Sequence, residues 1–110
     1  MYDPIPVRTL IVHTDGRTIP IFFKQANLLL NAPGPNNLKE WAVEAEEIDS
    51  ESAERLEDLF HSVKTCTIHI ETMNRFSLEG KIRIDQIAVG PHAHARFKGV
   101  GLLSGFERLV

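Results

Sequence analysis

The stretch that decides the fold runs from Ser50 to Leu103 and reads SESAERLEDLFHSVKTCTIHIETMNRFSLEGKIRIDQIAVGPHAHARFKGVGLL. Its first part predicts one short amphipathic helix over residues 51–63. The apolar residues of this part recur three or four positions apart, which is the spacing of one helix face: Ala53, Leu56, Leu59, Phe60 and Val63. Asp49 or Ser50 can cap the first turn, because a short polar side chain there accepts a hydrogen bond from a free backbone N–H.

The strand expected after the helix, over residues 65–71, alternates apolar and polar residues. This alternation is typical of a strand with one buried face. Cys66 lies on the apolar side and is the only cysteine of the chain. It therefore has no partner for an internal disulfide, and we interpret it as a small buried hydrophobic residue.

The two strands that follow change their buried face in mid-course. The first keeps one parity up to Ile84 and takes the other at Ile87. The second changes after Phe97, so that Val100 and Leu102 are expected on the buried side. Since one extra residue reverses every side chain beyond it, each change predicts a β-bulge or a sharp bend. Long bent strands favour a mainly β fold, an antiparallel β-sandwich or barrel with one flanking α-helix.

The N-terminal part begins with two prolines in an expected extended arm over residues 1–6. A strand over 7–14 and a return strand over 17–24 are joined by Asp15-Gly16, a pair suited to a two-residue hairpin turn. Pro20 has no N–H to donate, which places the return strand at a sheet edge or at a gap in the ladder. With 110 residues, the chain is expected to form a single β-rich domain over 1–110.

Three segments are less decided by their residues. The apolar run within 25–30 fits either a strand or a helix. Two prolines, a glycine and three asparagines make 31–37 a flexible loop. Segment 38–48 fits a helix, because Asn37 and Glu40 imitate a capping box, but its apolar residues also alternate as in a strand, which we favour.

Composition excludes several classes of protein. The net charge of −3 argues against a specific nucleic-acid binder, because phosphate recognition needs concentrated Lys and Arg. No run of 18 apolar residues is present, so no membrane span is expected. The first residues lack the basic and apolar regions of a signal peptide, and an intracellular location is the simplest expectation.

No constellation of residues predicts an enzyme, a metal site or a cofactor. His92 and His94 project to one face of a strand and could share a metal, but a third ligand is not evident, and an exposed turn explains them better. His69, Glu71 and Asp85 could meet on the polar faces of neighbouring strands. Such groups are commonly a solvated surface. We therefore expect no catalytic, cofactor-binding or metal-binding residues.

The charges are distributed unevenly along the chain. Eight carboxylates fall within residues 44–58, whereas basic residues cluster later. One interpretation is an acidic helix start, favoured by the helix dipole, plus ordinary surface. The other is a protomer whose acidic side contacts the basic side of a copy, as in head-to-tail rings or filaments. The candidate assembly residues are Glu44, Glu46 and Glu47 on the acidic side and Arg96 and Lys98 on the basic side.

The stretch from the helix onward, about half of the chain, resembles the C-terminal half of tail tube proteins of long-tailed bacteriophages. The resemblance rests on a G-x-I-x-I-x-x-I run followed by an F-x-G-x-G-x-L signature. The matching residues are Gly80, Ile82, Ile84 and Ile87, then Phe97, Gly99, Gly101 and Leu103. The main tube protein and a smaller relative in a tail or secretion apparatus both fit this pattern.

The resemblance implies a structural subunit of a phage or prophage tail, found in the virion or, before assembly, in the bacterial cytoplasm. Its copies would form a ring, and rings would stack into a tube and contact other tail proteins. Pairing between copies would also conceal the unpaired N–H and C=O groups of long edge strands. The alternative is a small monomeric β-barrel that recognises a protein or a ligand at a sheet edge.

Overall fold

The structure is a computed structural model that describes residues 4–14, 16–31, 40–62 and 65–105. Its elements in chain order are β1 (Ile5–Thr14), β2 (Arg17–Ile21), β3 (Gln25–Asn31), β4 (Glu40–Glu46), α1 (Ser50–Ser62), β5 (Cys66–Thr72), β6 (Ser77–Ala88) and β7 (His94–Ser104). The two undecided segments form strands: 25–30 lies within β3, and the described part of 38–48 is β4 up to Glu46, with Glu47 and Ile48 beyond its end. The expected loop 31–37 lies outside the described residues except for Asn31, which ends β3. No helix among the described residues is long and apolar enough to cross a membrane.

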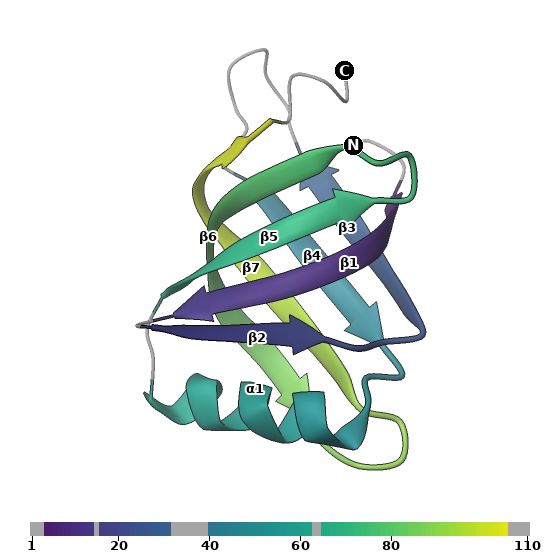
Figure 1. Cartoon of the computed structure of the whole chain (residues 1–110), viewed down its shortest axis with the longest axis vertical. Coiled ribbons are helices and arrows are strands. Elements are labelled where there is room, and N and C mark those ends of the chain that lie inside the picture. Colours follow the sequence, from purple (N-terminus) through teal and green to yellow (C-terminus); the bar gives the residue numbers. More distant parts are fainter. Residues whose placement is uncertain (1–3, 15, 32–39, 63–64, 106–110) are drawn as a thin grey trace.

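Six strands close into an antiparallel barrel, with β2 as an extra strand and α1 beside it (Figure 1). The strand order is β2-β1-β3-β4-β7-β6-β5, and pairing of β1 with β5 closes the barrel. Closure covers the edge that β5 would otherwise have, whereas β2 keeps an outer edge. The predicted fold class, a mainly β antiparallel barrel with one flanking helix, is confirmed.

Strand β1 makes the closure possible because it changes neighbours along its length. At its start, Ile5 and Pro6 lie opposite Leu28 and Asn27 of β3. Farther on, the same side of β1 pairs with β2, while its other side pairs with β5 from Val7 onward. The expected arm over 1–6 therefore needs correction, because its last two residues belong to β1; residues 1–3 lie outside the described part of the chain.

The first predicted change of face, in β6, is confirmed as a bulge. Ile84 lies opposite Phe97 and Gln86 opposite Arg96, so Asp85 is one extra residue on β6. Inward-facing residues before the bulge have even numbers, and after it the half-buried Ile87 takes their place against the core. The sequence alternation located this irregularity because the side-chain period of a strand is two.

The second predicted change of face, in β7, is wrong. Leu103 is buried, whereas Val100 and Leu102 are 42% and 66% exposed. Lys81 pairs with Val100 and Glu79 with Ser104, so β7 has two more residues than β6 between these pairs. Because the excess is an even number, the buried residues of β7 keep odd numbers on both sides of it. The inward position that an apolar residue would take is occupied by Gly99, because the ring of Trp41 fills the space there.

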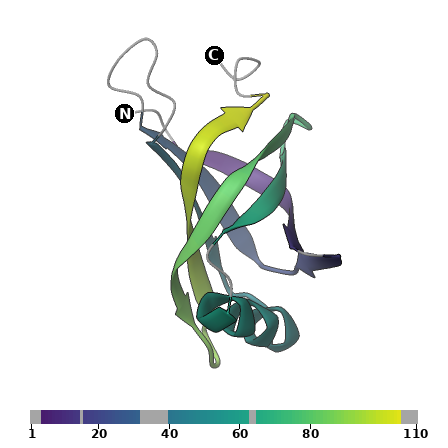
Figure 2. The ribbon, with the colours of Figure 1, turned by 90° about the vertical axis from the view of Figure 1, so that its left-hand side faces the viewer.

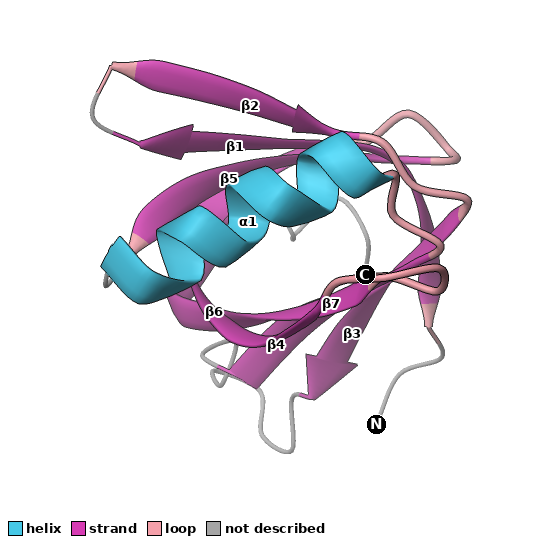
Figure 3. Ribbon diagram, turned by 90° about the horizontal axis from the view of Figure 1, so that it is seen from below, coloured by secondary structure: helices cyan, strands magenta, loops and turns pink. Residues whose placement is uncertain are grey.

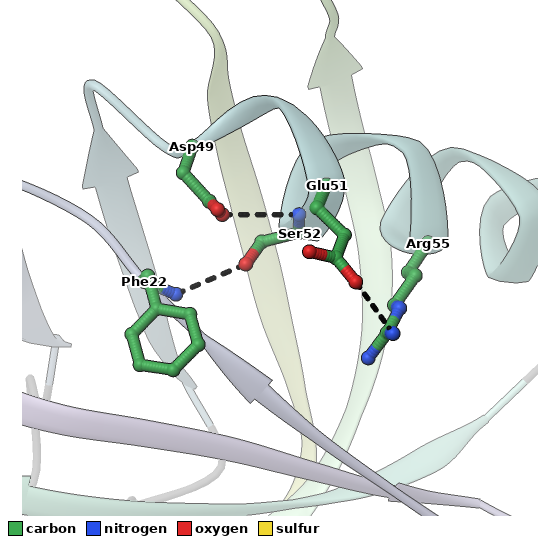
Figure 4. Close-up of polar contacts among 5 residues, drawn as sticks. All are labelled: Phe22, Asp49, Glu51, Ser52 and Arg55. Atoms are coloured by element: carbon green, nitrogen blue, oxygen red, sulfur yellow. Dashed lines mark hydrogen bonds and ion pairs between the residues drawn. The ribbon is translucent and has the colours of Figure 1, made fainter.

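Helix α1 lies across one end of the barrel, as Figure 3 shows from below. Asp49, one of the two expected caps, accepts a hydrogen bond through Oδ1 from the N–H of Ser52 at 3.0 Å. Ser52 is buried, and its Oγ accepts a hydrogen bond from the N–H of Phe22 at 3.1 Å (Figure 4). The inward face of the helix buries Ala53, Leu56 and Leu59 against the barrel core.

The inside of the barrel is filled by apolar side chains. The strands are strongly tilted, so that they cross one another in the side view (Figure 2). Leu10, Ile68 and Phe97, from three different strands, are fully buried in one cluster. The described strands of one chain therefore enclose a packed apolar core. The candidate functional residues lie on the outer surface of the barrel.

Candidate functional site

Arg96 is the centre of a charged cluster on the outer face of β4, β6 and β7. Register places it opposite Glu44, and its Nη1 lies 2.8 Å from Glu44 Oε2. The bulge in β6 brings Asp85 to the other side, where Oδ2 lies 3.7 Å from Arg96 Nε. The structure thus joins two candidate assembly residues, Glu44 and Arg96, within one chain, and the proposed contact of this pair between copies stays a prediction.

The other acidic candidates lie at the end of β4 nearest to the helix. Glu47 has a positive φ of 53° and accepts a hydrogen bond through Oε1 from His92 Nδ1 at 2.9 Å. Glu46 lies opposite His94 in the β4–β7 register. These groups line an open surface hollow of about 360 Å³. His92 and His94 are both exposed, so the hollow is in contact with solvent.

The hollow does not gather the ligands of a metal ion. His94 Nδ1 lies near the carbonyl of His92, at 3.4 Å, and His92 is bound to Glu47. Within the described residues, no group of three or more His, Cys, Asp or Glu side chains could hold a metal ion.

The carboxylates and imidazole of the second sequence hypothesis have different partners. His69 Nδ1 lies 3.7 Å from Glu79, Glu71 lies 3.8 Å from Arg8, and Asp85 contacts Arg96. No hydrogen bond or ion pair of the described residues joins the three to one another.

Cys66 lies in the barrel wall and is 8% exposed. Burial raises the pKa of its thiol above the ordinary value, because a thiolate would lose hydration there. A thiol that stays protonated is a poor nucleophile and a poor metal ligand. Its surroundings fit the interpretation of Cys66 as a core residue.

Lys98, the last candidate, lies on the outer face of β6 and β7 beside other basic residues of the later part of the chain. Lys98 lies directly opposite Arg83 of β6, and the next pair on the same face of the sheet is Lys81 with Val100. All three cations are exposed, and no ion pair or hydrogen bond involves them in the described structure. That Arg83 and Lys98 are neighbours follows only from the β6–β7 register, which the sequence does not reveal.

The outer edge of β2 is partly covered by its own chain. In a two-residue hairpin the N–H and C=O groups of Thr18, Pro20 and Phe22 point away from β1. Pro20 has no donor, and the N–H and C=O of Phe22 bind Ser52 Oγ and the N–H of Asp49. Prolines and covering segments of this kind oppose strand addition.

The end of β7 is different. Its register with β4 stops at the pair Ala42–Lys98, and beyond this point the described pairing of β7 is with β6 alone. Gly101 has a φ of +87° and its carbonyl accepts a hydrogen bond from Trp41 Nε1 at 2.9 Å. The exposed surface around this end carries Val100 and Leu102, so apolar and basic groups adjoin here.

Comparisons of the chain with protein-family models, with curated proteins and with solved structures find no match.

Proposed function

We propose that this chain is a self-assembling structural subunit of a phage or prophage tail, whose copies form rings that stack into a tube. The observation that carries the proposal is the architecture: a closed antiparallel barrel with a single helix between β4 and β5. This is the fold that the sequence resemblance implies. The filled interior also favours a structural role, since positions that could line a ligand cavity hold packed apolar side chains.

The surface supports association between copies rather than a self-contained monomer. Large apolar side chains are exposed at separate places on the molecule: Phe22, Phe60, Met73, Val89, Val100 and Leu102. Single exposed apolar residues are normal, but Val100 and Leu102 adjoin cations that lack a partner within the described structure. Such a surface is removed from water at low cost when a partner of opposite charge covers it.

Sedimentation velocity of the purified full chain over a wide range of concentration tests the proposal, with electron microscopy of negatively stained samples. We expect the mass to rise above that of the 12.4 kDa monomer as concentration increases, and we expect images of rings or tubes. A strict monomer at the highest concentration would overturn the proposal. That result would favour a monomeric binding module, for which the end of β7 is the open sheet edge.

A further inference from the structure

We infer that copies of this chain associate head to tail, with the outer face of α1 in one copy docked on the outer face of β6 and β7 in the next. The inference rests on the proposed function and names its contact surfaces. The first surface, called here the basic patch, consists of Lys81, Arg83, Lys98, Val100 and Leu102. The second, the acidic helix face, consists of Glu54, Glu57 and Phe60.

The basic patch carries an arrangement that is unfavourable in a free monomer. Arg83 and Lys98 lie directly opposite each other on neighbouring antiparallel strands. Like charges in such cross-strand pairs destabilise a sheet. Lys81, two residues from Arg83 on the same side of β6, adds a third cation. An anionic partner would offset this repulsion. Within the described chain, no carboxylate forms an ion pair with any of these three cations.

The carboxylates that border the basic patch are engaged elsewhere. Glu79, next to Lys81 on the same face, lies 3.7 Å from His69. Asp85, at the other end, contacts Arg96 at 3.7 Å. The patch therefore keeps a net positive charge, although the whole chain has a net charge of −3.

The basic patch also has an apolar part with a shape suited to a side chain. Val100 and Leu102, with Lys81, Thr67 and the carboxylate of Glu79, line a shallow open hollow of about 320 Å³. Both apolar side chains are substantially exposed in the monomer. An apolar group of a partner would be removed from water here, which favours association.

The acidic helix face has the complementary composition. Glu54 and Glu57 are three residues apart, so their side chains are neighbours on α1, and both are exposed, whereas Leu56 and Leu59 are buried. Arg55 is paired with Glu51 at 2.7 Å, so this cation of α1 is engaged by a carboxylate other than Glu54 and Glu57 (Figure 4).

Phe60 gives the acidic helix face its apolar part. It follows Glu57 after three residues, is 42% exposed, and its ring lies edge-on to the ring of His61, with 5.4 Å between the ring centroids. A helix face with two carboxylates and one aromatic ring thus matches a sheet face with three cations and two aliphatic side chains.

The two surfaces are different parts of one molecule. Helix α1 lies across one end of the barrel, whereas β7 runs from that end to the other, where its last residues lie (Figures 1 and 2). A contact between two different surfaces is heterologous. Repetition of such a contact closes into a ring or continues as a filament.

Two double variants test the inference. Arg83→Glu/Lys98→Glu reverses the basic patch, and Glu54→Lys/Glu57→Lys reverses the acidic helix face. Each variant then carries like charges on both surfaces, so we expect the concentration at half-assembly to rise by about 10-fold or more, which corresponds to ~1.4 kcal/mol. An equal mixture of the two should assemble again, because each reversed surface then meets a reversed partner.

The matched control for the basic patch is Lys24→Glu/Arg75→Glu, which changes the net charge equally at two exposed loop cations. It should assemble as the wild-type chain does. Circular dichroism and thermal denaturation verify that every variant is folded. For a variant that does not fold, the neutral pair Arg83→Gln/Lys98→Gln or Glu54→Gln/Glu57→Gln replaces it, with the same direction of effect.

Three results would overturn the inference. Folded variants that assemble as the wild type does would refute the docking surfaces while leaving the proposed function intact, and so would a mixture that stays dissociated. A wild-type chain that never assembles would remove the proposed function and the inference together. Binding of labelled duplex DNA by the wild type, lost on reversal of the basic patch, would assign that patch to phosphate recognition instead.

Discussion

Trp41 Nε1 donates a hydrogen bond to the carbonyl oxygen of Gly101 at 2.9 Å, which ties the start of β4 to the far part of β7. The ring of Trp41 is 3% exposed and lies against two glycines of neighbouring strands. A Cβ atom added at Gly99 would lie 2.2 Å from the ring, and one added at Gly80 would lie 2.6 Å from it. The two glycines therefore provide the space that the indole ring occupies.

Substitution of Gly99 by alanine should destabilise the chain. The added methyl group overlaps ring atoms of a buried tryptophan, and overpacking of this kind costs about 1–3 kcal/mol. Urea denaturation of Gly99→Ala measures the loss. Lys98→Ala, at the adjacent exposed position, is the matched control and should change stability by less than about 0.5 kcal/mol.

The destabilisation should depend on the indole ring. In a Trp41→Leu background the added methyl group meets a smaller side chain, so Gly99→Ala should cost less there than in the wild type. Equal costs in both backgrounds would show that the two residues are not in conflict and would contradict the packing described here.

Substitution of Ser52 by alanine should weaken the attachment of α1 to the segment that follows β2, because it removes a hydrogen bond between them. The N–H of Phe22 would lose its acceptor, Ser52 Oγ, at a site where Ser52 is 3% exposed. Loss of a partly buried hydrogen bond of this kind costs about 0.5–1.5 kcal/mol. Hydrogen exchange at the Phe22 amide should accelerate. Ser50→Ala, at an exposed position two residues earlier, should leave that exchange rate unchanged.

Local patterns predicted the elements whose periodicity is unambiguous. Alternation located β5, and the parity change between Ile84 and Ile87 located the bulge at Asp85. The helix expected over 51–63 is Ser50–Ser62 in the structure. These features depend on neighbours in the sequence, so the sequence contains enough information to place them.

Long-range pairing explains what the sequence patterns missed. Val100 and Leu102 look like core residues until Trp41, about sixty positions earlier, is known to occupy the inward side of Gly99. Likewise, the partner of Arg96 within the chain follows from pairing of β4 with β7, which no local signal reveals. The expectation that Arg96 contacts another copy was made without knowing that Glu44 of the same chain binds it.

The thiol of Cys66 should make stability fall at alkaline pH. Burial raises its pKa, so the folded chain retains the proton at pH values where the unfolded chain has lost it. The contribution is therefore fully present below the ordinary thiol pKa and is lost as pH rises toward the raised one. Denaturation curves of the wild type and Cys66→Val above pH 9.0 compare the two. Parallel pH profiles would contradict the raised pKa.

Arg96 and Lys98 are two residues apart on β7 but should respond differently to reversal of charge. Arg96→Glu places a third carboxylate beside Glu44 and Asp85, so it should lower stability by about 1 kcal/mol, the upper range for exposed ion pairs. Lys98→Glu replaces a repulsion with Arg83 by an attraction and should leave stability equal or higher. Urea denaturation measures both.

Assembly should show the opposite order of effects. Lys98 is part of the basic patch, whereas Arg96 is held within its own chain by two carboxylates. In sedimentation velocity, Lys98→Glu should therefore raise the concentration at half-assembly more than Arg96→Glu does. If Arg96→Glu is instead the variant that dissociates while it remains as stable as the wild type, then its ion pairs within the chain are weak, and Arg96 faces a neighbouring copy.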